Sequence, residues 1–298
     1  MTPRRRYEAP PHWSETTITR DCHRALEAMV DRRLREGGEP YRKAFDGRRR
    51  ILSQLFAETN DLRQLSSSAV TPRYAAAVRY LTGPPVSADD LKTFATSVRF
   101  KTISEPKRTA EIVASLLDLL RFPWISRQRG PTSVERDRAI QWTAGLWAVE
   151  AIRTGRRSDE SRNQERTVRS LVERAGFRPH RSRRAHRPDE IPVGAFTGEL
   201  SLGGPKADVC ARLRDGRLLA IECKVSNSEL NSVKRLLREV GGKARQWQAL
   251  FGTQVVTAAV LRGVFRPANV FEAQEDYSVA VFWEHHLGPL REFLGRAE

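Results

Sequence analysis

Residues 205–225 read PKADVCARLRDGRLLAIECKV, and this stretch decides the fold that the sequence predicts. Two runs of strand-like composition, 206–213 and 217–225, flank the dipeptide Asp215-Gly216. Asp-Gly between alternating apolar residues is a strong signal for a tight hairpin turn. The stretch therefore predicts two antiparallel strands at the centre of a sheet.

Three polar residues interrupt these strands where a core strand is expected to be apolar. They are Asp208 in the first strand and Glu222 and Lys224 in the second. Glu222 and Lys224 are two residues apart, so both side chains leave the same face. A two-residue loop would place Asp208 opposite Cys223, on the other face. A three-residue loop with Gly216 in the left-handed conformation places Asp208 opposite Glu222, and we expect this arrangement.

The sequence pattern of the rest of the chain changes near residue 155. Residues 1–155 are predicted to be a mostly helical DNA-gripping or recognition region. Within it, a helix is expected over 133–154, in which Trp142 and Trp147 have the spacing of core residues. Residues 156–298 alternate between helical and strand-like runs. We expect a helix at 159–176, strands at 191–200, 206–213 and 217–225, a helix at 229–250 and a strand at 254–261. This order, α-β-β-β-α-β, predicts an α/β (α+β) domain with a mixed central sheet flanked by helices.

The composition favours a nucleic-acid partner. Lys and Arg number 52 against 36 Asp and Glu, which gives a net charge of +16, and residues 161–187 contain nine arginines against two glutamates. Such charge suits polyanions, although an arginine bias can also reflect genome composition. The sequence shows no apolar run long enough for a membrane span, no signal peptide, and three cysteines without a disulfide or zinc spacing. A cytoplasmic protein is expected.

The motif Pro205-x-x-Asp208 followed by Glu222-Cys223-Lys224 resembles that of the PD-(D/E)xK nucleases. The predicted element order also resembles the core of that superfamily. A narrower resemblance, to the XamI-type restriction endonucleases, lies in KADV (206–209), DGR (215–217), IECKVSNS (221–228), NSVKRL (231–236), GGKA (241–244), GVF (263–265) and FWEH (282–285). It implies a Type II enzyme that cuts double-stranded DNA at a short palindromic site. A palindromic site is matched most simply by two subunits related by a twofold axis, so we expect a homodimer.

The residue types predict how such a site would work. Asp208, Glu222 and the backbone carbonyl of Cys223 offer hard oxygen ligands suited to Mg²⁺. Lys224 can hold the attacking water or a phosphate oxygen. In the superfamily the preceding helix often supplies an accessory carboxylate, which makes Glu165 a further candidate, with Glu199 as a second one. A structural ion pair is the alternative reading of Glu222 and Lys224.

DNA contacts are expected from polar residues that follow the second strand and begin the next helix, where helix N-termini favour phosphate and Asn and Arg suit base edges. They are Ser226, Asn227, Ser228, Asn231, Lys234, Arg235 and Arg238. Two other functions remain open at this point. One is a structure-specific repair or recombination nuclease, and the other is a DNA-binding protein on a catalytically dead nuclease fold.

Overall fold

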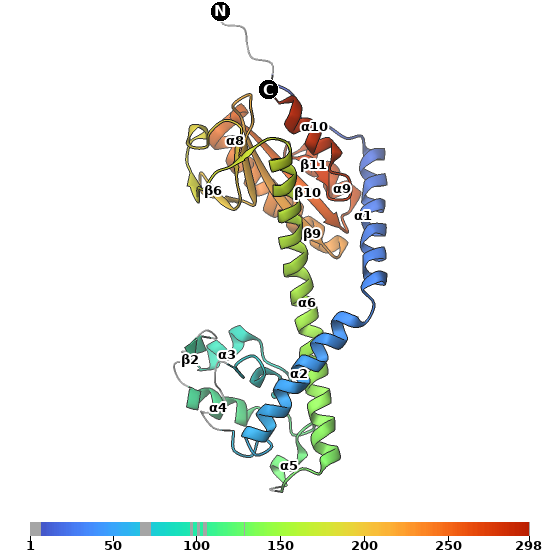
Figure 1. Ribbon diagram of the computed structural model, residues 1–298, viewed down its shortest axis with the longest axis vertical. Helices are drawn as coiled ribbons and strands as arrows, with labels where there is room; N and C mark the ends of the chain where they lie inside the picture. The colour runs from blue at the N-terminus through green and yellow to red at the C-terminus, as the bar shows by residue number, and fades with distance from the viewer. Residues whose placement is uncertain are drawn as a thin grey trace, which may run out of the picture. The chain divides into compact units, whose positions relative to one another are not determined.

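The structure is a computed structural model that describes residues 7–65, 73–95, 98–99, 102–103, 106–127 and 129–297. The chain divides into two compact units. The helical unit comprises residues 36–156, and the sheet unit combines the residues up to 35 with residues 157–298. This division differs from the predicted one in one respect, since helix α1 (Glu15–Glu36) belongs with the sheet unit rather than with the helical region (Figure 1).

The longest helix, α6 (Ser133–Arg174), continues without interruption for 42 residues. The sequence predicts two helices here with a break at Gly155, and that prediction is wrong. One glycine inside a helix costs only about 1 kcal/mol relative to alanine, and the surrounding Ala, Arg and Glu residues are good helix formers. The helix ends near the predicted position, because Gly176 adopts a left-handed φ of +91° and its N–H bonds to the Glu173 carbonyl.

The helical unit consists mainly of helices around an aromatic core, which confirms the predicted helical character of the first half. Phe56, Phe122 and Trp124 pack edge to face with ring centroids 5.7 to 6.2 Å apart. Its elements are α2 (Glu39–Glu58), η1 (Val78–Tyr80), α3 (Ala88–Ala95), β1 (Val98–Arg99), β2 (Thr102–Ile103), α4 (Pro106–Ser115), α5 (Pro123–Ser126) and the first part of α6.

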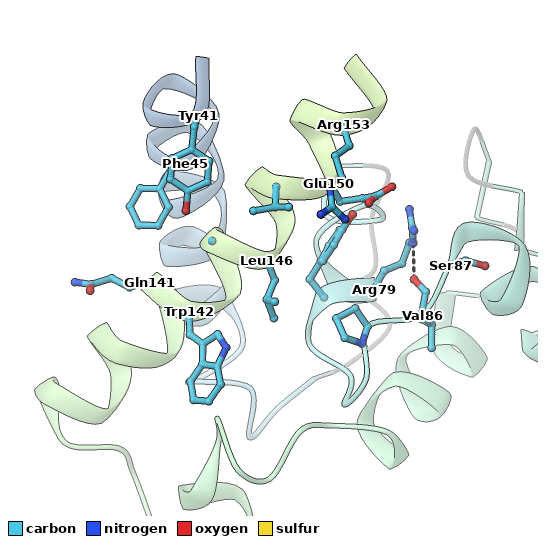
Figure 2. Close-up of a pocket in the computed structure, with 14 residues that line it drawn as sticks. Tyr41, Phe45, Arg79, Val86, Ser87, Gln141, Trp142, Leu146, Glu150 and Arg153 are labelled. Carbon is cyan, nitrogen blue, oxygen red and sulfur yellow. Dashed lines mark hydrogen bonds between the residues drawn. The ribbon is translucent and has the colours of Figure 1, made fainter. Parts of the chain in front are cut away.

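A hollow of about 840 Å³ lies between α2, η1 and α6 in this unit (Figure 2). Trp142 on α6 lines the hollow and is 52% exposed, whereas Trp147 on the same helix is buried and stacks on Tyr80 at 5.5 Å. The expectation that the tryptophans of this helix are core residues therefore holds for Trp147 and is wrong for Trp142.

A six-stranded mixed sheet in the order β11-β10-β9-β8-β5-β3 forms the centre of the sheet unit. β10 is parallel to β9 and β11, and β8 is antiparallel to β9 and β5. Its strands are β3 (Arg178–Pro179), β5 (Ala195–Thr197), β8 (Val209–Arg212), β9 (Leu218–Ser226), β10 (Val255–Gly263) and β11 (Ala280–Trp283). A second sheet, in the order β4-β6-β7, contains β4 (Arg184–Ala185), β6 (Leu200–Leu202) and β7 (Lys206–Ala207), and η2 (Pro188–Glu190) follows β4.

Helices cover both faces of the large sheet. The end of α6 and α10 (Gly288–Arg296) pack on the face that includes Ile221 and Cys223 of β9. The opposite face carries α1, α9 (Pro267–Glu275) and one continuous helix made of α7 (Glu229–Ser232), the π-helical η3 (Val233–Gly241) and α8 (Gly242–Phe251), before η4 (Gly252–Gln254). The series α6, β5, β8, β9, this helix and β10 has the predicted α-β-β-β-α-β order, so the predicted mixed α/β fold is confirmed. No helix in the described part of the chain is long and apolar enough to span a membrane.

Candidate active site

The β8–β9 hairpin has the predicted register. Val209 pairs with Ile221, and the Leu213 N–H donates to the Arg217 carbonyl at 2.8 Å across a loop in which Gly216 has a φ of +93°. The three-residue bulged loop is therefore confirmed. The next position along the hairpin brings Asp208 level with Glu222.

Asp208 leaves the regular ladder of the sheet at this position, between β7 and β8. Its N–H donates to the Ile221 carbonyl at 3.1 Å, and its Oδ2 accepts the backbone N–H of Cys223 at 2.7 Å. A carboxylate that accepts a backbone N–H has a defined orientation, so Asp208 is held against β9 beside Glu222 and Lys224.

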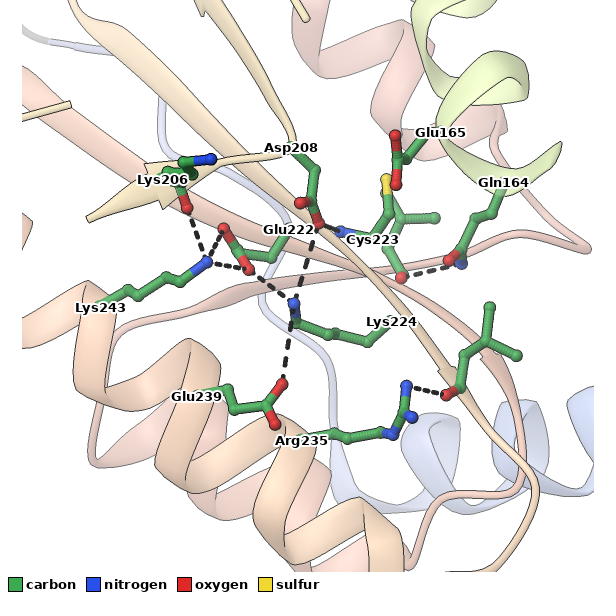
Figure 3. A network of polar contacts seen from close by, with 12 residues as sticks. Gln164, Glu165, Lys206, Asp208, Glu222, Cys223, Lys224, Arg235, Glu239 and Lys243 are labelled. Carbon is green, nitrogen blue, oxygen red and sulfur yellow. Dashed lines mark hydrogen bonds and ion pairs between the residues drawn. The ribbon is translucent and has the colours of Figure 1, made fainter. Parts of the chain in front are cut away.

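Lys224 lies among three carboxylates (Figure 3). Its Nζ is 2.7 Å from Glu222 Oε2, 3.8 Å from Asp208 Oδ2 and 4.0 Å from Glu239 Oε2. Glu222 is completely buried, and Lys224 is largely buried. Since a buried carboxylate is unstable without a positive partner, this contact compensates part of the charge of Glu222.

Lys243 on α8 supplies a second positive charge to Glu222, and sequence reasoning did not assign it to the site. Its Nζ donates to both carboxylate oxygens at 2.8 Å and to the Lys206 carbonyl at 2.6 Å. The sequence offers only a weak signal for it, the four-residue spacing of polar side chains along the helix, because spacing alone does not show which side of the helix packs on the sheet. Arg235, Glu239 and Lys243 follow one another every four residues, and each of them contacts a residue of β9.

The electrostatics of the site follow from burial. Burial raises the pKa of Glu222 above 4.5, and the charges of Lys224 and Lys243 oppose that rise. Burial alone would lower the pKa of Lys224, but the carboxylates of Glu222 and Asp208 outweigh it and raise that pKa above 10.5. Lys224 therefore remains protonated at neutral pH and can act only as a hydrogen-bond donor there.

Glu165 on α6 lies near the Asp208 carboxylate (Figure 3). Burial raises the pKa of Glu165, and the negative charge of Asp208 raises it further, so the two carboxylates are close enough to interact electrostatically. Glu199 is exposed at the turn after β5, and its carboxylate accepts a hydrogen bond from Lys206 at 2.7 Å.

The described residues fit a divalent cation bound through oxygen. The oxygens of Asp208 and Glu222 already converge on one positive charge, that of Lys224. The N–H and C=O of a strand residue leave the same edge of the strand, so Cys223 directs its carbonyl toward the edge that Asp208 occupies. Over the described ranges, no three His, Cys, Asp or Glu side chains form a group that could hold a metal, so the carbonyl and water would complete the ligand set.

The thiol of Cys223 takes no part in this site. It packs in the core beneath α6, and burial raises its pKa well above 9.0.

The residues predicted to contact DNA differ in their exposure. Ser226 is buried and donates its hydroxyl to the Ser228 carbonyl at 2.8 Å, and Arg235 donates to the Val225 carbonyl at 2.6 Å. The exposed members of the set are Asn227, Asn231, Lys234 and Arg238. These four side chains are the ones that a DNA surface could reach without rearrangement.

Comparisons with known proteins identify the family of the chain. The model of the XamI restriction endonuclease family matches residues 60–283, a range that contains Asp208, Glu222, Lys224 and Lys243. The chain belongs to the XamI restriction endonuclease family. It is 33% identical over 270 residues, covering 85% of this chain and 97% of the relative, to the Type II restriction enzyme XamI of Xanthomonas campestris pv. amaranthicola. No solved structure matches the chain. Membership of this family makes the protein a site-specific deoxyribonuclease, and it does not favour a repair nuclease or a catalytically dead fold.

Proposed function

We propose that the protein is a Type II restriction endonuclease of the PD-(D/E)xK type that hydrolyses double-stranded DNA at a short palindromic site. The observation that supports this most directly is the position of Lys224, whose ammonium lies between the carboxylates of Asp208 and Glu222. Type II restriction endonucleases generally need a divalent metal, and we propose Mg²⁺ because carboxylate and carbonyl oxygens are its preferred ligands.

Each residue of the site has its own proposed role in hydrolysis. Asp208, Glu222 and the carbonyl of Cys223 would hold the metal, which when bound acidifies water and neutralises negative charge at the phosphate. Lys224, protonated and held by Glu222, donates to the attacking water or to a non-bridging phosphate oxygen. Glu165 would act as an accessory acidic group next to Asp208, with a raised pKa that suits proton transfer.

DNA would lie along the start of the helix that follows β9 and along parts of the helical unit. Asn227, Asn231, Lys234 and Arg238 have exposed side chains beside the catalytic strand. In the helical unit, the hollow in Figure 2 combines the half-exposed Trp142 with the amide of Gln141 and the guanidinium groups of Arg79 and Arg153, beside one carboxylate, that of Glu150. Aromatic and guanidinium groups are typical of nucleic-acid contacts. This supports a DNA-gripping role for the helical unit.

We further propose that the active assembly is a homodimer. Two subunits related by a twofold axis match the symmetry of a palindromic site and supply one active site for each strand. A cytoplasmic location fits the three free cysteines, all of them buried, because reduced thiols are typical of a reducing compartment.

The experiment that tests the proposal is digestion of plasmid DNA of known sequence in Mg²⁺, followed by mapping of the fragment ends. We expect discrete fragments whose ends share one sequence. Asp208→Asn and Glu222→Gln should abolish cleavage and retain DNA binding in Ca²⁺, while Glu173→Gln, an exposed change on α6, should cleave normally. Cleavage at the wild-type rate by either active-site variant would refute the assignment, and a preference for junctions or flaps would indicate a repair nuclease.

A further inference from the structure

Three exposed arginines lie in β4 of the second sheet and in the segment just before it. Arg181, Arg183 and Arg184 are all exposed, and within the described ranges none of them forms an ion pair. Several other arginines close in the sequence are engaged, whereas the exposed Arg178 of β3 has no ion pair within the described ranges. Arg162 and Arg169 of α6 pair with Asp159 and Glu165, and Arg187 lies 3.5 to 3.6 Å from Asp189 and Glu190.

The backbone that carries these arginines is held by strand pairing. Arg184 of β4 pairs with Ser201 of β6, and Ser201 pairs in turn with Lys206 of β7. The Ser201 N–H donates to the Arg183 carbonyl at 3.0 Å. The Thr197 hydroxyl donates to the Ser182 carbonyl at 3.1 Å. Because these backbone groups have partners, the segment is a fixed platform rather than a free loop.

The second sheet is also anchored to the core. Ala185, Leu202 and Ala207 are buried in one cluster with Trp247 of α8, and the Trp247 indole donates to the Leu202 carbonyl at 2.9 Å. β7 leads directly into Asp208. The arginines are therefore connected to the proposed metal-binding carboxylate through two strand pairings and a packed core.

We propose that Arg181, Arg183 and Arg184 form a phosphate clamp that binds the DNA backbone and sets its position relative to Asp208. Guanidinium groups match phosphate geometry, are always charged, and release condensed counterions when they bind. A clamp on a rigid sheet supplies affinity without reading bases, because phosphate contacts position DNA and base contacts specify its sequence. This proposal rests on the proposed endonuclease function.

The test compares two charge-matched variants. R181A/R183A/R184A removes the clamp, and R35A/R291A/R296A removes three exposed arginines from α1 and α10. Binding of a fluorescein-labelled duplex of arbitrary sequence is followed by anisotropy in EDTA between about 50 and 200 mM KCl. The slope of log K against log [KCl] is negative, and in the clamp variant its magnitude should be smaller by about 2.7. The ratio of the wild-type binding constant to that of the clamp variant should therefore fall by about fortyfold between the two salt concentrations. The control variant should keep the wild-type slope.

Circular dichroism first confirms that both variants fold. An unchanged slope in the clamp variant, or an equal decrease in both variants, would overturn the proposal. The proposed function is tested separately by plasmid cleavage with wild-type protein, which does not depend on the slopes. If the salt slopes are as expected but the wild-type protein fails to cleave DNA in any divalent ion, the proposed nuclease function is refuted and the proposed clamp is not. Normal cleavage by the wild-type protein, together with a wild-type salt slope in the clamp variant, would refute the clamp alone.

Discussion

Replacing Lys243 by Met tests whether the second ammonium at Glu222 stabilises the site. Lys243 donates three hydrogen bonds, two of them to a completely buried carboxylate. Loss of the only partner of a buried charge costs about 3–5 kcal/mol. Lys224 remains 2.7 Å from Glu222 in the variant, and Lys243 is itself one-quarter exposed. We therefore expect a loss of about 2 kcal/mol in the free energy of unfolding.

The stability lost in Lys243→Met should depend on pH, and the direction of that dependence can be predicted. The pKa of Glu222 is raised by burial, and removal of a nearby positive charge raises it further. A raised pKa of an acid in the folded state favours folding at low pH, so the variant loses stability as the pH rises through that pKa. The deficit relative to wild type should be complete at neutral pH and should vanish in acid, where Glu222 is protonated and needs no counter-charge.

The assay is urea unfolding in EDTA at neutral pH and at several lower values, with Lys243→Arg as the matched variant that keeps the charge. Arg should recover part of the lost stability, because it can still donate two hydrogen bonds to the carboxylate. A free energy of unfolding for Lys243→Met within about 0.5 kcal/mol of wild type at neutral pH would refute the reasoning. A deficit that persists unchanged in acid would show that Lys243 acts through packing and not through charge.

Three other outcomes follow from the site. Lys224→Met should slow single-turnover cleavage at least about a hundredfold while calorimetry still detects Ca²⁺ binding; fast cleavage would exclude Lys224 from the reaction. Asn231→Ala should weaken binding of the cognate duplex by about 1–3 kcal/mol and of random DNA much less, and equal losses in anisotropy titrations would place base recognition elsewhere. Sedimentation should give two subunits per cognate duplex, and one subunit that cuts both strands would contradict the homodimer.

The β8–β9 hairpin could be predicted because its determinants are local. Strand periodicity places Glu222 and Lys224 on one face, and the length of the loop at Gly216 sets their register against Asp208. Both follow from short-range backbone geometry. The predicted turn and register are therefore observed.

The contribution of Lys243 could not be predicted in this way, because it depends on how a helix packs against the sheet. The residues between Val233 and Gly241 are π-helical, which changes the angular spacing of side chains along the helix that carries Lys243. The membership of α1 in the sheet unit is a similar case. Its apolar residues Ile18, Cys22 and Ala25 predict a buried face, but only the tertiary structure shows that this face packs beside β10 and β11.

The three cysteines offer a way to follow local opening of the sheet unit. Each thiol is free and buried, and each lies in a different apolar cluster: Cys22 with α1 and α9, Cys210 with Trp247, and Cys223 beneath α6. Burial raises the pKa of Cys22 and Cys210 to about 12, which suppresses the reactive thiolate. Alkylating reagents should therefore modify the native enzyme only when a layer separates from the sheet. The order in which the three positions become labelled would report which layer opens first.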